Sequence, residues 1–178
     1  MTDDQQRDVF KDKENAEKHF RLFFEIIKKV KGDQQLLTYA LLLINGILED
    51  NRNRIQYLVG IQRSHKKDRQ EDLINILTSF LYQSSSQNSI EQRDLAAHIL
   101  AMLIEAVEFK NCSSEAKQFL NWIMEQKHTS SRQVSNYAYT FTLMYLLKTN
   151  ELAREFVDQN GFDIYSQLLD KDCLEDHQ

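Results

Sequence analysis

Residues 134–169 read VSNYAYTFTLMYLLKTNELAREFVDQNGFDIYSQLL, and this stretch decides the fold. Apolar side chains recur every three to four residues from Val134 to Tyr145, which predicts a helix with one apolar face. Asn150 can cap a second, short helix with its side-chain oxygen. On that helix we expect Leu152, Phe156 and Val157 to point inward and Arg154 to point out.

A glycine marks the end of this second helix. Gly161 stands where a helix C-terminus favours a residue at positive φ, and Phe162 can fold back onto the last turn. A third apolar stripe then opens with Ile164, Tyr165, Leu168 and Leu169. Three short helices joined by tight corners, each too small to bury its own apolar face, form a stacking unit.

The composition favours helix throughout the chain. The 178 residues contain no proline and only four glycines, and no run of alternating valine and threonine predicts a strand. The length and the apolar share of 42% fit one domain with a substantial core. We therefore predict a single helical-repeat domain over residues 13–178, preceded by a frayed or disordered N-terminus at residues 1–12.

Charge and cysteine usage narrow the class of protein. A net charge of -5 argues against DNA or RNA as the main partner, since phosphate binding favours a basic surface. Two cysteines make no disulfide framework, and residues 1–15 lack the apolar core of a signal peptide. No apolar run is long enough to cross a bilayer. These features predict a soluble, cytosolic protein.

The first half of the chain predicts further helices. One helix is expected over residues 13–31, and Asp33 can cap the next, which is so apolar that we expect it to be central and packed on two sides. Gly46 inside that helix is expected to let a neighbouring helix approach closely. Ser89 and Gln92 form a capping box that opens another helix.

A polar corner recurs along the chain. Asn51 repeats the corner at Asn150, and the segments 36–61, 90–127 and 134–159 each pair a long apolar helix with a shorter one. The period of roughly forty residues is that of armadillo and HEAT repeats. The predicted fold is an all-α, armadillo/HEAT-like, right-handed helical solenoid of about nine short helices.

The motifs of catalysis and cofactor binding are missing from the sequence. It has no glycine-rich phosphate loop and no nucleophile elbow, and its five histidines and two cysteines show no metal-ligand spacing. His98, next to Ala96 and Ala97, is interpreted as a hydrogen-bonded structural histidine. We predict no catalytic, cofactor-binding or metal-binding residues and no cofactor, and the scaffold favours binding over catalysis.

A basic connection is the candidate binding element. The stretch from Arg63 to Arg69 is either a solvated loop or a contact for an acidic partner, and on the second interpretation the candidate partner-binding residues are Lys66, Lys67 and Arg69.

Several stretches, in order, resemble one family. They are YALLLINGILEDNRNR at 39–54, DLAAHILAML at 94–103, FLNWI at 119–123 and LKTNELAREFVDQNGF at 147–162. From about Phe20 to the end, the chain is similar to the N-terminal armadillo-like domain of the H subunit of the vacuolar proton-translocating ATPase (V-ATPase). The family's longer N-terminal lead-in and its C-terminal domain have no counterpart here, and the chain is expected to continue or to meet a partner beyond Leu169.

This resemblance implies a non-catalytic regulatory subunit of the ATP-hydrolysing sector, which helps to couple ATP hydrolysis to proton transport. The implied partners are the E and G subunits of the V-ATPase peripheral stalk, with other subunits of that sector and the membrane-bound a subunit as further candidates. The implied location is the cytosolic face of vacuolar membranes and other endomembranes, without insertion into the bilayer. The alternative is a generic armadillo or HEAT adaptor that binds an unrelated helix or peptide.

Overall fold

The computed structural model describes residues 12–29, 33–64, 72–82, 89–126, 133–163 and 166. Within these ranges every regular element is helical, which confirms the predicted all-α class. The elements in chain order are α2 (Lys13–Lys29), α3 (Gln34–Asp50), the 3-10 turn η1 (Arg52–Arg54), α4 (Ile55–Ser64), α5 (Leu73–Tyr82), α6 (Ile90–Ala106), the 3-10 turn η3 (Phe109–Asn111), α7 (Ser113–Glu125), α8 (Asn136–Leu146) and α9 (Asn150–Asp158).

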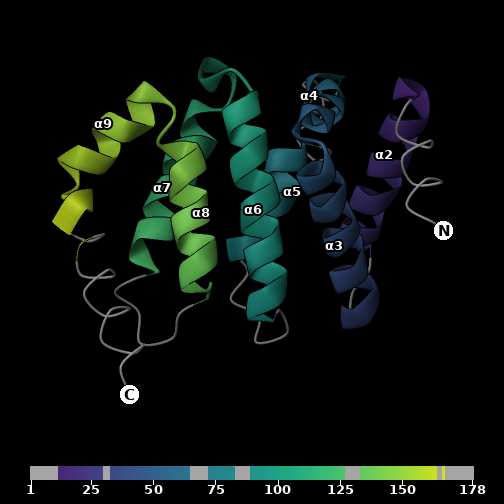
Figure 1. The fold of residues 1–178 in the computed structure, drawn as a ribbon, viewed down its shortest axis with the longest axis horizontal. Coiled ribbons are helices and arrows are strands. Elements are labelled where there is room, and N and C mark those ends of the chain that lie inside the picture. Colours follow the sequence, from purple (N-terminus) through teal and green to yellow (C-terminus); the bar gives the residue numbers. More distant parts are fainter. Residues whose placement is uncertain are drawn as a thin grey trace.

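The helices form a two-layered row (Figure 1). In one layer α6 stands between α3 and α8 and contacts both. In the other layer α4 and α5 pack against α6, and α7 packs against α8. Helices α2 and α9 lie at opposite ends of the row (Figure 1). Successive helices that contact mainly their neighbours along one axis agree with the predicted helical solenoid, whereas its right-handed sense stays a prediction.

Long-range polar contacts align the helices of the first layer. The side-chain Nε2 of Gln92, at the start of α6, donates to the carbonyl of Gln34 (3.1 Å) and to Oγ1 of Thr38 (2.7 Å), at the start of α3. The carboxylate of Asp94 in turn accepts from the backbone N–H of Ser135 (2.8 Å), which caps α8. Because these contacts join N-terminal ends, α3, α6 and α8 run in the same direction.

Helix α6 is the centre of the core. Every residue from Leu95 to Ile104 is buried, because α3, α4, α5 and α8 surround this helix. The small side chains of Ala96, Ala97 and Ala101 let these neighbours approach closely. Helix α3, which the sequence predicts to be central, does pack on two sides, against α2 and α6. The most enclosed helix is nevertheless α6.

The repeated pairing of helices is confirmed. Helices α3 and α4 are joined through η1, α6 and α7 through η3, and α8 and α9 through a short turn at residues 147–149. These pairs correspond to the predicted segments 36–61, 90–127 and 134–159. Helix α5 stands between the first two pairs and interrupts the period.

Two of the predicted caps are confirmed, and one is wrong. Asp33 accepts from the N–H of Leu36 (3.0 Å), and Ser89 with Gln92 forms the capping box of α6. The N-cap of α9 is Thr149 in an extended conformation, without a side-chain hydrogen bond, and Asn150 is already the first helical residue. The turn after α8 is thus one residue shorter than predicted.

The inward face of α9 is narrower than predicted. Leu152 and Phe156 are buried and Arg154 is exposed, as expected, but Val157 is half-exposed. Among the described helices, α9 packs mainly against α7 at the end of the row, and this contact covers one narrow stripe. Leu36 at the start of α3 is likewise exposed.

The end of α9 depends on Asn160 and Gly161 in different ways. The residue at positive φ is Asn160 (φ 57°), whereas the prediction places this conformation at Gly161. A Cβ on Gly161 would lie 2.4 Å from the ring of Phe156, so glycine is needed there for close packing. The predicted return of Phe162 is confirmed, since its ring meets that of Phe156 edge-on at 5.7 Å.

Gly46 does not have the role that the sequence suggests. A Cβ at this position would meet no atom within 4 Å, and the residue lies on the exposed side of α3. No described helix approaches closely there. Packing against the described residues therefore does not explain why a glycine, which stabilises a helix less than alanine, stands inside α3.

Candidate partner-binding surfaces

The basic residues singled out from the sequence, Lys66, Lys67 and Arg69, lie outside the described residues. Asp68 and Glu71, whose spacing predicts a capping pair for the next helix, fall in the same segment. The description of the chain stops at Ser64 and resumes at Asp72.

The two ends of this basic connection are held together. The Gln62 side chain donates through Nε2 to the Asp72 carboxylate (2.6 Å) and accepts through Oε1 from the N–H of Leu73 (2.9 Å). The same carboxylate accepts from the N–H of Ile74 (2.9 Å) and so caps α5. Because Gln62 is buried, these contacts fix where α4 ends and where α5 begins.

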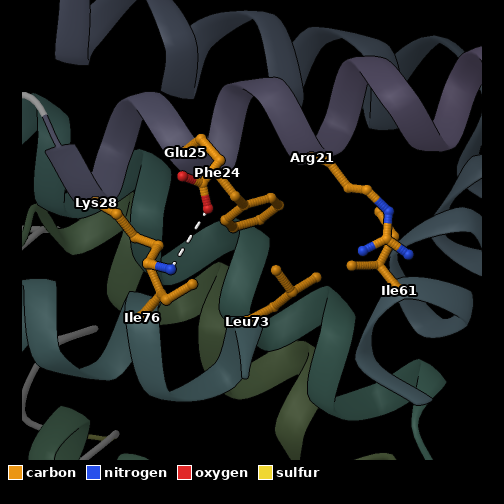
Figure 2. A pocket seen from close by; sticks show the side chains of 7 residues that line it. All are labelled: Arg21, Phe24, Glu25, Lys28, Ile61, Leu73 and Ile76. Atoms are coloured by element: carbon orange, nitrogen blue, oxygen red, sulfur yellow. Dashed lines mark hydrogen bonds and ion pairs between the residues drawn. The ribbon is translucent and has the colours of Figure 1, made fainter. Parts of the chain in front are cut away.

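A cleft opens beside those ends, between α2, α4 and α5 (Figure 2). Its volume is about 230 Å³. Phe24, Ile61 and Leu73 are buried and form an apolar floor, and Ile76 is a partly buried wall. The charged side chains of α2 rise along the rim: in Figure 2 the Arg21 guanidinium lies over Ile61, and the Lys28 ammonium lies toward Ile76.

The rim of this cleft carries more positive than negative charge. Glu25 accepts from Lys29 (2.7 Å) and from Lys28 (3.4 Å), so two cations share one carboxylate. The hydrogen bond from Lys29 is the main reason why the pKa of Glu25 lies below its usual value. The pKa of Lys29 is raised by the same contact. Among the residues that line the cleft, Arg21 and Lys28 are cationic and Glu25 is anionic.

A second candidate surface is the side of α3 and α8 that faces away from the core. On α3, Tyr39 and Leu42 are 59% and 45% exposed and precede Gly46 at helical spacing. On α8, Tyr137 and Met144 are 67% and 51% exposed. Single exposed apolar side chains are ordinary, and these four lie on two helices that α6 separates.

His98 of α6 supports this layer from within. It is 5% exposed, and its ring stacks on Phe141 at 3.9 Å and meets Tyr137 at 5.4 Å between centroids. Its Nε2 is buried and has no hydrogen-bond partner among the described residues, contrary to the predicted hydrogen-bonded histidine. Burial lowers the pKa of His98, and the nearby carboxylates of Asp94 and Glu49 offset part of this effect. The imidazole therefore packs as a neutral aromatic ring.

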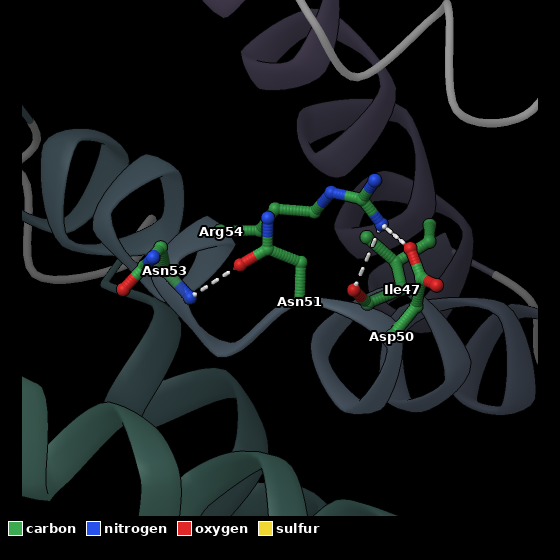
Figure 3. A network of polar contacts seen from close by, with 5 residues as sticks. All are labelled: Ile47, Asp50, Asn51, Asn53 and Arg54. Carbon is green, nitrogen blue, oxygen red and sulfur yellow. Dashed lines mark hydrogen bonds and ion pairs between the residues drawn. The ribbon is translucent and has the colours of Figure 1, made fainter.

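The corner after α3 is a rigid polar network (Figure 3). Asn51 accepts from the N–H of Asn53 (3.0 Å). The guanidinium of Arg54 donates to the Asp50 carboxylate (2.7 Å) and to the carbonyl of Ile47 (3.2 Å), which also accepts from the N–H of Asn51 (3.4 Å). This network turns the chain from α3 into α4, where the sequence predicts only a polar corner.

The corner also reaches α8. The guanidinium of Arg52 and the ammonium of Lys148 lie over the ring of Tyr145, at 5.5 and 4.3 Å from its centroid. Lys148 also pairs with Glu105 of α6 (3.2 Å). Cations on an aromatic face stabilise such contacts by about 0.5–1 kcal/mol at exposed sites. These contacts join the C-terminal ends of α3, α6 and α8.

Two observations bear on the chemistry of the described residues. These residues contain no group of three or more histidine, cysteine or acidic side chains that could hold a metal ion. Cys112 is buried, and burial is the main cause that raises the pKa of its thiol to about 11, so the thiol is protonated at neutral pH and is a poor nucleophile. Trp122 packs against Phe119 and Tyr82 at the core boundary.

Comparison with known proteins identifies one family. The family model for the H subunit of V-ATPases matches residues 1–177. This match begins at the first residue, whereas the resemblance noted in the sequence begins near Phe20. No curated protein and no solved structure matches the chain. None of the described helices is long and apolar enough to cross a membrane.

Proposed function

Because the chain belongs to the family of V-ATPase H subunits, we propose that it is a non-catalytic regulatory and structural component of that proton pump's ATP-hydrolysing sector. In this role it binds the peripheral stalk and helps to couple ATP hydrolysis to proton transport, while other subunits handle ATP. The observation that carries the proposal is the family match over residues 1–177.

The architecture supports a binding role. The buried helix α6 and the polar ties between neighbouring helices hold the described helices in one fixed arrangement. A rigid scaffold of this kind presents its exposed side chains in preset positions, which lowers the ordering cost of association. The apolar residues on α3 and α8 and the cleft beside α2 provide such side chains.

The proposed partners are the E and G subunits of the stalk, with other subunits of the ATP-hydrolysing sector and the membrane-bound a subunit as further contacts. The proposed location is peripheral, on the cytosolic face of vacuolar or other endomembranes. Residues 13–178 are proposed to act as one domain.

The basic connection between α4 and α5 is proposed to contribute to stalk binding through Lys66, Lys67 and Arg69. On either side of it in the sequence, Ile61 and Leu73 line the α2–α4–α5 cleft. Reversal of the three charges should weaken stalk binding and reduce its dependence on salt. An unchanged affinity and salt dependence would remove this connection from the interface.

Affinity capture from native membranes tests the proposed function. The tagged chain should recover the E and G subunits in a mild detergent that preserves the assembled V-ATPase. The same extract should be probed for the assembled pump, so that its loss during solubilisation is not mistaken for a lack of binding. Recovery of an unrelated helical protein without any V-ATPase component would instead establish a generic adaptor.

A further inference from the structure

The described residues of α2, α4 and α5 enclose a cleft. It combines an apolar floor of Phe24, Ile61 and Leu73 with cations along one rim (Figure 2). Its volume of about 230 Å³ suits one large apolar side chain rather than a cofactor, because small-molecule sites usually enclose about 300–1,000 Å³.

The positions of the cations define the complementary ligand. Arg21 and Lys28 are seven positions apart on α2 and lie at the two ends of the apolar floor (Figure 2). Seven helical residues span about 10.5 Å. Two carboxylates seven positions apart on a second helix have the same separation, and a residue three or four positions after the first lies between them on the same face.

We propose that this cleft docks an acidic amphipathic helix of the partner. One large apolar side chain of that helix enters between Phe24, Leu73 and Ile76, and carboxylates at positions i and i+7 meet Arg21 and Lys28. The anchor is the residue at i+3 or i+4. This inference rests on the proposed function in one respect: it assigns the helix to the peripheral stalk.

The charge balance at the rim favours an acidic rather than a basic partner. Lys28 and Lys29 share the single carboxylate of Glu25, so a further acidic group can pair with Lys28 without breaking the closer 2.7 Å contact between Lys29 and Glu25. A basic helix would instead bring like charges beside Arg21 and Lys28. The chain as a whole carries a net charge of -5, so this rim is a local exception to an acidic protein.

The test is a binding titration of the purified chain with the purified E–G stalk heterodimer. Ile76→Trp fills the cleft while keeping the side chain apolar, and the double variant Arg21→Gln/Lys28→Gln removes the two end charges. Ile76→Trp occupies the place of the partner's apolar anchor. It should weaken binding by about tenfold or more, as expected when a central buried contact is lost. Arg21→Gln/Lys28→Gln should weaken the binding affinity by only a few fold and reduce its dependence on salt concentration.

Matched controls separate the cleft from general effects on the surface. Leu22→Trp adds the same bulk to an exposed position of α2 that does not line the cleft. Lys110→Gln removes a cation at η3, where it pairs with Glu108 (2.6 Å). Both controls should bind as the unmodified chain does, and circular dichroism should show the same helix content and melting temperature for every variant.

The outcomes distinguish this inference from the proposed function. If the unmodified chain binds and only the cleft variants lose affinity, both stand. If the cleft variants bind like their controls, the cleft is overturned as the docking site while the proposed function survives. If the unmodified chain does not bind the heterodimer at all, the proposed function and the docking inference fail together.

Discussion

Gly46 provides a quantitative test of the fold. It lies in the interior of α3 at an exposed position, and a Cβ added there would meet no atom within 4 Å. Gly46→Ala therefore introduces no clash, and it removes conformational freedom from the unfolded chain. The expected gain is about 0.4–1 kcal/mol in the free energy of unfolding.

For a chain of this length, 1 kcal/mol shifts the melting temperature by about 2–4 °C. Gly46→Ala should therefore raise it by about 1–4 °C, measured by circular dichroism on heating and checked by the midpoint of urea unfolding.

Gly60 supplies the matched control for this measurement. It lies inside α4, but a Cβ there would come within 3.1 Å of the Glu17 carboxylate, which must move. Gly60→Ala should thus raise the free energy of unfolding, and with it the melting temperature, by less than Gly46→Ala does. A lower melting temperature for Gly46→Ala would refute the reasoning, because it would mean that another part of the protein packs against this face of α3.

Three further predictions concern buried groups. Gly161→Ala should lower the free energy of unfolding by about 1–3 kcal/mol, read from urea unfolding, because its Cβ would lie 2.4 Å from an aromatic ring. His98 has a lowered pKa in the folded state, so its protonation favours unfolding, and the free energy of unfolding should fall as the pH drops below about 6.5. His98→Gln should make the free energy of unfolding depend less on pH, as measured by urea unfolding at several pH values. Cys112 is buried, and its thiol has a pKa of about 11. In a Cys173→Ser variant it should react slowly with a thiol reagent in the folded protein and rapidly after unfolding. Fast labelling of the folded protein would contradict its burial.

The sequence predicts the helices well because their signals are local. The capping pair at Ser89 and Gln92, the cap at Asp33 and the apolar periodicity of each segment depend on residues a few positions apart. These local signals are enough to place the three helix pairs and hence the repeat. The family resemblance rests on the same segments and is confirmed by the match over residues 1–177.

The errors come from packing between distant elements. Nothing near Val157 in the sequence shows that α9 lies at the end of the row, and so the sequence pattern predicts its burial. The ring of Phe156 determines the need for Gly161, whereas Asn160 takes the left-handed conformation, which asparagine tolerates. The sequence also suggests a close contact at Gly46, but glycine alone cannot reveal whether a neighbour is present.

The candidate site is only partly accessible from sequence. The basic connection is visible as a run of like charge, but the cleft combines α2 with α4 and α5, whose residues are about forty to fifty positions away. The spacing of Arg21 and Lys28 could have indicated a charged stripe. Only the fold shows that this stripe flanks an apolar floor formed by Ile61 and Leu73.

The most direct test of the central claim is photo-cross-linking inside the assembled pump. A photoreactive amino acid at position 28, on the rim of the cleft, should form an adduct with the E or G component of the stalk in native membranes, identified by mass spectrometry. The same group at position 110 should give no stalk adduct. Adducts at position 28 with proteins outside the V-ATPase alone, in membranes where the pump is intact, would contradict the account.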